Sequence, residues 1–256
     1  MAWDRDIHVK NPAEIKLMRE AGRVNALALA AVRELIQPGV TTADLNAAAE
    51  ETLRKHNAYS PFKNYGYPPY PASICTSVNE ELVHGIPDKK RKLKEGDIIS
   101  VDCGSVVEGF VGDAAFTAGV GAISAEAQRL IDVTKQALDV AIAMMRVGNK
   151  TGDISAAIQQ YVESQGLQVV REYTGHGVGR KMHEGPQVPN YGTPGTGVPL
   201  RVGMTIALEP MVLVGTYKTR VLSNQWTVVS ADGSLTAHQE HSVAVTEGDP
   251  LVLTVP

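Results

Sequence analysis

The pattern of apolar positions predicts helices separated by strand-like stretches. Apolar residues recur at helical spacing from Ile15 to Leu29, after Asn11-Pro12-Ala13-Glu14, which combines a cap residue, an early proline and a glutamate. The same spacing predicts helices that begin near Thr42 and that run over residues 125–147 and 153–164. The chain therefore mixes helices with a large amount of β-structure.

A strand-like stretch predicts a β-hairpin that carries two aspartates. An apolar strand begins at Ile98, and Glu108-Gly109 suits a two-residue turn. With that turn Asp113 lies opposite Gly104, and Asp102 and Asp113 are diagonal neighbours on one face, about 7–8 Å apart at the backbone. Two carboxylates this close raise one pKa unless a cation lies between them. The hairpin therefore predicts a cation site if other segments supply ligands.

Two segments of the first half recur in the second half, in the same order and at almost the same spacing. They pair residues 39–48 with 148–157 and residues 95–102 with 202–209. The second match aligns Asp102 with Glu209. We expect an α+β fold with pseudo-twofold symmetry, in which one domain over residues 1–256 has halves over roughly 11–120 and 121–250. We expect a site between two sheets that face each other.

Composition adds few constraints. A net charge of −4 gives no general attraction to nucleic acid or membranes, and 43% hydrophobic and 20% charged residues are typical of a globular protein. Cys75 and Cys103 are too few for a disulfide framework, and the charged residues 1–10 contain no apolar signal core. We expect a cytoplasmic monomer that does not enter a membrane.

The second half supplies the remaining candidate ligands. A duplicated hairpin predicts another acidic residue there, and Glu240 lies near the start of a strand-like segment. Four converging carboxylates would repel strongly in a partly buried site, and two divalent cations would resolve that repulsion. His176 is the candidate nitrogen ligand, because Gly175 and Gly177 let the backbone fold tightly around its ring. These glycines do not match a nucleotide-binding spacing.

Each of these residue types also has an ordinary interpretation. An aspartate in a strand is usually solvated, and Tyr67, Tyr70 and Trp226 could be core residues. Four histidines are interpreted as surface or hydrogen-bonded core residues: His8, His56, His238 and His241. Only the five candidate ligands stand out, because their joint occurrence in one chain is improbable: Asp102, Asp113, His176, Glu209 and Glu240.

Five motifs together resemble methionine aminopeptidase. They are Val83-His84-Gly85-Ile86-Pro87, the pair Asp102 and Asp113, Gly175-His176-Gly177-Val178-Gly179-Arg180 with His183-Glu184, Glu209-Pro210-Met211, and Glu240-His241. The resemblance extends from Asn11 to Thr246. It implies the pita-bread fold of creatinases and aminopeptidases, with two similar halves of helices and antiparallel sheet, which agrees with the repeat.

The resemblance also implies a metal site and its catalytic residues. Two divalent ions, cobalt, manganese or iron, would be bridged by Asp113 and Glu240; Asp102 would complete one coordination sphere, and His176 and Glu209 the other. Glu209 would shuttle a proton, and His84 and His183 would contact the scissile amide and the tetrahedral intermediate. The implied pocket for a methionine side chain consists of Tyr67, Tyr70, Cys75, Met182 and Trp226. Met182 stands where many relatives have an aromatic residue.

The implied activity is removal of the initiator methionine from nascent proteins and from peptides with a small second residue. The short separation of Glu209 and Glu240 resembles the short, bacterial-style type I form. Two alternatives are a proline-specific aminopeptidase of the same fold, whose members carry a further N-terminal domain, and a non-catalytic binding protein on this scaffold. The basic run Lys89, Lys90, Arg91 and Lys92 is either a solvated connector or a contact to ribosomal RNA.

Overall fold

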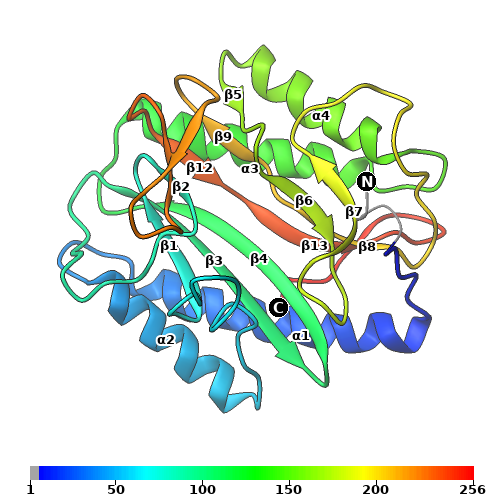
Figure 1. Ribbon diagram of the computed structural model, residues 1–256, viewed down its shortest axis with the longest axis horizontal. Helices are drawn as coiled ribbons and strands as arrows, with labels where there is room; N and C mark the ends of the chain where they lie inside the picture. The colour runs from blue at the N-terminus through cyan, green and yellow to red at the C-terminus, as the bar shows by residue number, and fades with distance from the viewer. Residues whose placement is uncertain (1–5) are drawn as a thin grey trace.

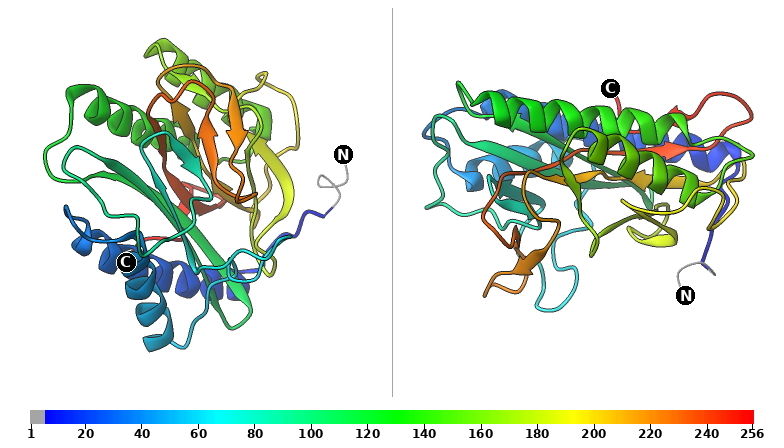
Figure 2. Two further views of the ribbon diagram at one scale, coloured as in Figure 1. Left: turned by 60° about the vertical axis from the view of Figure 1, so that its left-hand side comes forward. Right: turned by 90° about the horizontal axis from the view of Figure 1, so that it is seen from above.

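Within residues 6–256, which the computed structural model describes, four helices cover one face of an antiparallel sheet (Figure 1). They are α1 (Pro12–Leu35), α2 (Thr42–Lys55), α3 (Ala125–Ala143) and α4 (Thr151–Ser164). In the right-hand view of Figure 2 the helices lie on one side of the sheet and long loops lie on the other. All the helices predicted from the sequence are confirmed, although α3 ends earlier than expected.

The helix starts show why these segments fold as they do. At the start of α1, the Asn11 side chain accepts hydrogen bonds from the backbone N–H groups of Ala13 and Glu14, and the Glu14 side chain accepts one from Asn11 N–H. In the two halves, α2 and α4 are each 14 residues long. The aspartate at the third position of each helix, Asp44 or Asp153, accepts a hydrogen bond from the backbone N–H of the N-cap residue. The equivalent starts support the internal repeat.

The strands in the described part of the chain form one large sheet, which contains strands from both halves, and two small sheets. The strands are β1 (Ile74–Val78), β2 (Glu81–Val83), β3 (Ile98–Val107), β4 (Phe110–Gly119), β5 (Gln168–Val169), β6 (Thr174–Gly177), β7 (Glu184–Pro189), β8 (Thr205–Leu208), β9 (Met211–Leu213), β10 (Thr219–Val221), β11 (Val228–Ser230), β12 (Thr236–His238), β13 (Glu240–Ala244) and β14 (Leu251–Val252). The order of strands in the large sheet is β1-β3-β4-β13-β8-β6-β7, with β14 beside β13. Two small sheets have the orders β10-β11-β2 and β12-β9-β5.

The pairing of β4 with β13 corrects the expectation of two facing sheets. Glu240 pairs with Ala115 and His241 with Ala114, so the backbone ladder continues from one half into the other. An unpaired edge of β4 would leave a row of backbone donors and acceptors without partners, and β13 covers that edge. The two halves therefore share one sheet, and residues from both project from the same surface.

The hairpin of β3 and β4 has the predicted register. Asp102 pairs with Ala115 and Gly104 with Asp113, which confirms that the two aspartates share a face. Glu108 and Gly109 form the turn, with φ values of 48° and 76°, as a two-residue hairpin turn with two left-handed positions requires.

Helix α1 lies very close to the opposite face of this hairpin. A Cβ on Gly112 would be 2.7 Å from Gly22 N, so the two backbones leave no room for a side chain. The Asn25 side chain donates hydrogen bonds to the backbone oxygens of Cys103 and Gly112, and Ser105 Oγ donates to Ala21 O at 2.7 Å. These contacts fix the hairpin that carries Asp102 and Asp113.

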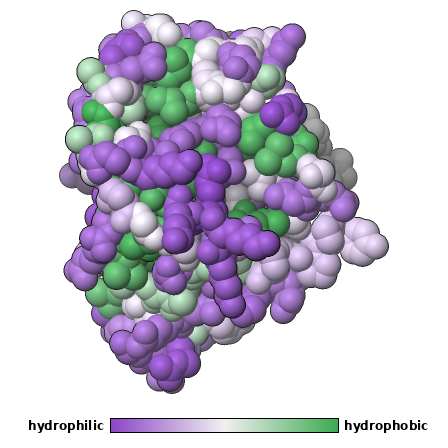
Figure 3. Space-filling view, turned by 90° about the vertical axis from the view of Figure 1, so that its left-hand side faces the viewer, coloured by the Kyte–Doolittle hydropathy of each residue, from purple (hydrophilic) through white to green (hydrophobic). Residues whose placement is uncertain are grey.

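Two large apolar clusters fill the space between helices and sheet. One packs α1 and α2 against β3 and β4 and includes Val24, Leu45 and Val101; the other packs α3 and α4 against β8 and β13 and includes Leu130 and Ile206. Figure 3 shows that the face at the left of Figure 1 is largely hydrophilic, with separate apolar patches. No helix in the described part of the chain is both long enough and apolar enough for a membrane span.

We expect the Gly112→Ala substitution to lower the free energy of unfolding by about 1–3 kcal/mol, because the added methyl group must push α1 away from the hairpin. Urea denaturation followed by circular dichroism measures this change. Gly248→Ala is the matched control, since a methyl group there meets open space and the backbone is not left-handed. Equal stability of the two variants would contradict the close packing described above.

Candidate metal centre

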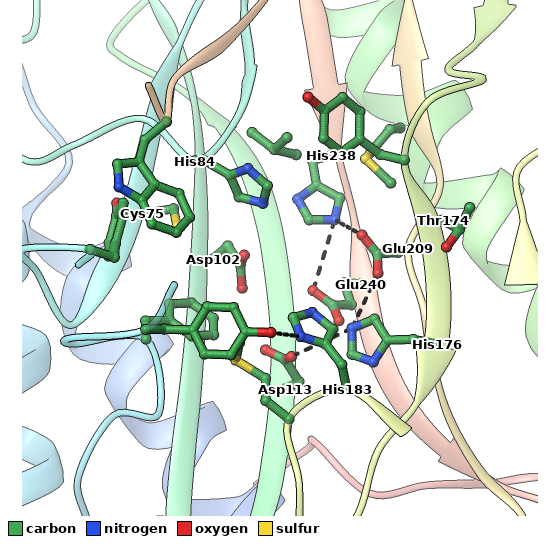
Figure 4. Close-up of a pocket in the computed structure, with 18 of the residues that line it drawn as sticks. Cys75, His84, Asp102, Asp113, Thr174, His176, His183, Glu209, His238 and Glu240 are labelled. Atoms are coloured by element: carbon green, nitrogen blue, oxygen red, sulfur yellow. Dashed lines mark hydrogen bonds and ion pairs between the residues drawn. The ribbon is translucent and has the colours of Figure 1, made fainter. Parts of the chain in front are cut away.

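A cavity of about 260 Å³ opens on the face of the sheet that carries Asp102 and Asp113, opposite α1. It receives side chains from both halves of the chain, and Figure 4 shows carboxylates and imidazoles pointing toward one another inside it. Eleven of the twelve candidate site residues line the cavity: Tyr70, Cys75, His84, Asp102, Asp113, His176, Met182, His183, Glu209, Trp226 and Glu240. Only Tyr67 does not.

Strand pairing places the four carboxylates. Asp102 and Glu240 both pair with Ala115, one from each neighbouring strand, so the three residues form a row across β3, β4 and β13. The small side chain of Ala115 leaves space between the two carboxylates. Asp113 lies two residues along β4 on the same face, and Glu209 follows the end of β8, where Leu208 pairs with His241.

His176 directs one ring nitrogen at this cluster. Its Nδ1 lies 2.9 Å from Gly177 O, and because a carbonyl oxygen only accepts, Nδ1 carries the proton. The lone pair of Nε2 therefore faces Glu209 Oε1 at 3.4 Å and Asp113 Oδ2 at 4.0 Å. Burial lowers the pKa of His176 to about 3, so the ring is neutral at physiological pH. A neutral imidazole with a fixed tautomer is a good metal ligand.

His238 is a residue that sequence reasoning misinterpreted. It is neither a surface residue nor a hydrogen-bonded core residue: it lines the cavity at 2% exposure, and its Nε2 has no hydrogen-bond partner. That nitrogen is 3.8 Å from an oxygen of Glu209 and 3.8 Å from an oxygen of Glu240. The available signal was its position two residues before Glu240 in a strand-like segment, which puts both side chains on one face.

The carboxylates are held in an environment that disfavours their charge. Burial is the largest cause, and repulsion from the neighbouring carboxylates the next largest, of the raised pKa of Asp102, Glu209 and Glu240, which lies well above the ordinary value. The pKa of Asp113 is raised to about 7, mainly by burial. Such a cluster needs protons or cations to be stable at neutral pH.

The donor atoms fit divalent cations. The Oδ1 atoms of Asp102 and Asp113 are buried and make no hydrogen bond. Donor atoms of Asp102, His238 and Glu240 lie within 4.8 Å of one another, and so do those of Asp113, His176 and Glu240. Unsatisfied buried oxygens next to ring nitrogens are the ligands that first-row divalent metals take.

An aromatic and sulfur-containing pocket adjoins the cluster. Tyr70 and Trp226 meet edge to face with ring centroids 5.1 Å apart, and Cys75 pairs with Asp102 across β1 and β3. Met182 contacts the same apolar group. Burial and the nearby Asp102 carboxylate raise the pKa of the Cys75 thiol well above its usual value, so its sulfur remains a neutral wall.

Tyr67 is a correction to the predicted pocket. Its side chain is 97% exposed, because Trp226 packs against Gly66 and donates a hydrogen bond to Pro68 O, which turns Tyr67 outward. Tyr65 lines the cavity instead, with its hydroxyl 2.8 Å from His183 Nδ1. Three tyrosines within a few residues gave no sequence signal to choose between them.

His84 and His183 lie at the cavity wall beside the cluster. The His183 ring is 4.3 Å from the His176 ring, centroid to centroid. Its loop is held by Glu184, which accepts hydrogen bonds from the N–H groups of Arg180 and Lys181. His84 has a left-handed backbone with φ of 60°, and burial lowers its pKa to about 4.

Fold and site together define a metallopeptidase. The sequence pattern of metallopeptidase family M24 matches residues 16–247, and the chain belongs to that family. Within the family it belongs with the short bacterial methionine aminopeptidases. It is 53% identical to the methionine aminopeptidase of Clostridium acetobutylicum over 249 residues, which cover 97% of this chain and 99% of the relative.

Solved structures agree with this assignment. The crystal structure of methionine aminopeptidase from Thermotoga maritima matches with a TM-score of 0.95 at 48% identity, covering 98% of this chain and 100% of that one. A prolidase from Pyrococcus furiosus matches at 19% identity with a TM-score of 0.78, and only 67% of that chain is covered. The prolidase therefore shares the fold alone.

We expect protein stripped of metal with a chelator to lose thermal stability as the pH rises from about 6.5 to 8.5, and Mn²⁺ to restore more stability at the higher pH. The folded state holds a proton on Asp113 up to about pH 7 that the unfolded chain releases near pH 4, so stability falls as the pH rises. The buried histidines act in the opposite direction, but only below about pH 6.5, where the unfolded chain binds their protons.

The unfolding midpoint measured at several pH values, with chelator or with Mn²⁺, tests this expectation. Asp113→Asn should flatten the pH dependence of the stripped protein. A midpoint that is independent of pH in the stripped protein, or a Mn²⁺ effect that is largest in acid, would contradict it.

Proposed function

We propose that this protein is an aminopeptidase that removes the N-terminal methionine from nascent proteins and from peptides with a small second residue. The observation that carries the proposal is the cavity, where a carboxylate–imidazole cluster adjoins a pocket of sulfur and aromatic side chains. The family membership and the methionine aminopeptidases among its relatives support it.

We further propose that five residues hold two divalent cations: Asp102, Asp113, His176, Glu209 and Glu240. Glu240 belongs to both groups of clustered donors, which supports its place among the residues that would hold the cations, and Asp113 would hold them beside it. When bound, the cations supply Lewis acidity toward the scissile carbonyl and the attacking water. A donor set of carboxylates and imidazole without thiolate suits manganese, iron or cobalt.

The protein side chains would then move the protons. Glu209 lies between the Nε2 atoms of His176 and His238, at 3.4 and 3.8 Å, and is 13% exposed. As the proton shuttle it takes a proton from water and delivers it to the departing amine.

His84 and His183 are proposed to contact the peptide bond. Burial keeps both rings neutral by lowering their pKa, so each offers one N–H donor rather than a positive charge. A neutral donor stabilises the tetrahedral oxygen without opposing the nearby cations. The Tyr65 hydroxyl and the loop around Glu184 fix the orientation of His183.

The methionine side chain is proposed to occupy the pocket formed by Tyr70, Cys75, Met182 and Trp226. A thioether is polarizable and packs well against sulfur and aromatic edges. All the proposed ligand positions are filled, which disfavours a non-catalytic binding protein. The greater similarity to methionine aminopeptidases than to prolidase disfavours the proline-specific alternative.

We expect the metal-loaded enzyme to release methionine from Met-Ala-Ser and to leave an X-Pro peptide intact. Glu209→Gln should lower kcat by about 10²-fold or more, since it removes the proton shuttle and keeps the shape. Product release followed by chromatography measures both, and Glu247→Gln, at an exposed position, is the matched control. Failure of the Mn²⁺- or Co²⁺-loaded enzyme to cleave either peptide would disprove the peptidase function.

We also propose that the protein works as a cytoplasmic monomer and contacts the ribosome through Lys89, Lys90, Arg91 and Lys92. These four side chains are exposed, whereas Leu93 beside them is buried and anchors the loop. A cluster of exposed cations binds phosphate backbones in a salt-dependent manner.

Reversal of the four charges to glutamate should reduce co-sedimentation with ribosomes at low salt at least several-fold, because each reversal replaces attraction to phosphate with repulsion. The matched control reverses four other exposed cations: Lys16, Arg54, Lys55 and Lys135. Equal co-sedimentation of the wild type and both variants would exclude the contact.

A further inference from the structure

His238 occupies a place in the cavity that the five proposed ligands leave unexplained. It ends β12, and its ring points between Glu209 and Glu240 (Figure 4). The Nε2 atom is 3.8 Å from each of these carboxylates, too far for a hydrogen bond, and it has no other partner. A buried ring nitrogen without a partner is unfavourable unless something else satisfies it.

Two hydrogen bonds to a threonine hydroxyl fix the backbone of His238. Its N–H donates to Thr117 Oγ1 at 2.9 Å, and the same hydroxyl donates to His238 O at 2.8 Å and also lies 2.8 Å from Ser100 Oγ. These hydroxyls belong to β3 and β4, the strands that carry Asp102 and Asp113. The position of the imidazole is therefore set by the same hairpin as the two aspartates.

We propose that His238 is an additional nitrogen ligand of the metal centre, on the side of Asp102, so that each cation contacts one imidazole. This inference rests on the proposed dinuclear centre. Donor atoms of Asp102, His238 and Glu240 lie within 4.8 Å of one another, as do those of Asp113, His176 and Glu240. The two groups share Glu240 and have the same composition, one aspartate and one histidine each.

The chemistry explains what this ligand contributes. Four carboxylates already match the charge of two divalent cations, so a further carboxylate would leave the centre negative. A neutral imidazole adds a donor without adding charge. It also gives the Asp102 side a nitrogen ligand, which the five proposed ligands place only beside Asp113.

His241 provides a matched comparison on β13, the next strand along the chain. Its Nδ1 lies 2.8 Å from Thr254 Oγ1, and it does not line the cavity. The two histidines thus differ in the one property that matters: His241 has a protein partner for its ring, whereas Nε2 of His238 faces the carboxylates without one.

The test counts the histidine rings that bind metal in the full-length protein. NMR of protein with isotope-labelled histidine side chains, loaded with a magnetic isotope of cadmium, detects scalar coupling between the cation and each ligating ring nitrogen. We expect two coupled rings, His176 and His238, in the wild type and in His241→Gln. His238→Gln should retain only the coupling to His176.

Calorimetric titration with Mn²⁺ gives a second readout that does not depend on catalysis. We expect His238→Gln to weaken one of the two binding events by at least about tenfold and His241→Gln to leave both unchanged. If the wild type binds metal but only His176 shows coupling, the His238 assignment is wrong and the proposed dinuclear centre stands. If neither ring couples and no heat of binding is measured, both proposals are wrong.

Discussion

The repulsion among four buried carboxylates is the constraint on which the rest of the structure depends. Asp102, Asp113, Glu209 and Glu240 converge because β4 pairs with β13 and so joins the two halves of the chain in one sheet. Carboxylates held this close and this dry raise one another's pKa, and the cluster is stable only when protons or cations neutralise it. The strand pairing therefore creates a cluster of carboxylates whose repulsion favours the binding of divalent cations.

A cluster of this kind needs a rigid support, since the carboxylates would move apart if they could. The support lies on the far face of the hairpin, where Gly112 lets α1 approach β4 and the Asn25 side chain binds the backbone of both strands. On the other edge, Ser242 and Asp113 exchange hydrogen bonds that tie β13 to β4. The arrangement of the four carboxylates thus depends on packing contacts that lie outside the cavity.

The sequence predicted whatever follows from local pattern. The turn at Glu108-Gly109 determines the register of the hairpin, and strand alternation then places Asp102 and Asp113, while the repeat points to Glu209. Other features depend on contacts between distant segments. The choice of Tyr65 over Tyr67 is made by Trp226, and the single sheet by the edge of β4. His238 was missed because a lone histidine is usually a surface or core residue, although its spacing from Glu240 was visible.

The pairing of Cys75 with Asp102 places the wall of the proposed methionine pocket directly beside the carboxylate cluster. The two residues are opposite one another on β1 and β3, so strand register fixes the wall of the pocket relative to the edge of the cluster. Burial, and then this proximity to Asp102, raises the pKa of the thiol and keeps it protonated, because a thiolate there would add charge to an already repulsive group. Cys75 can thus lie next to the proposed metal centre without becoming a ligand. The distance from the proposed methionine pocket to the carboxylate cluster is then set by strand register.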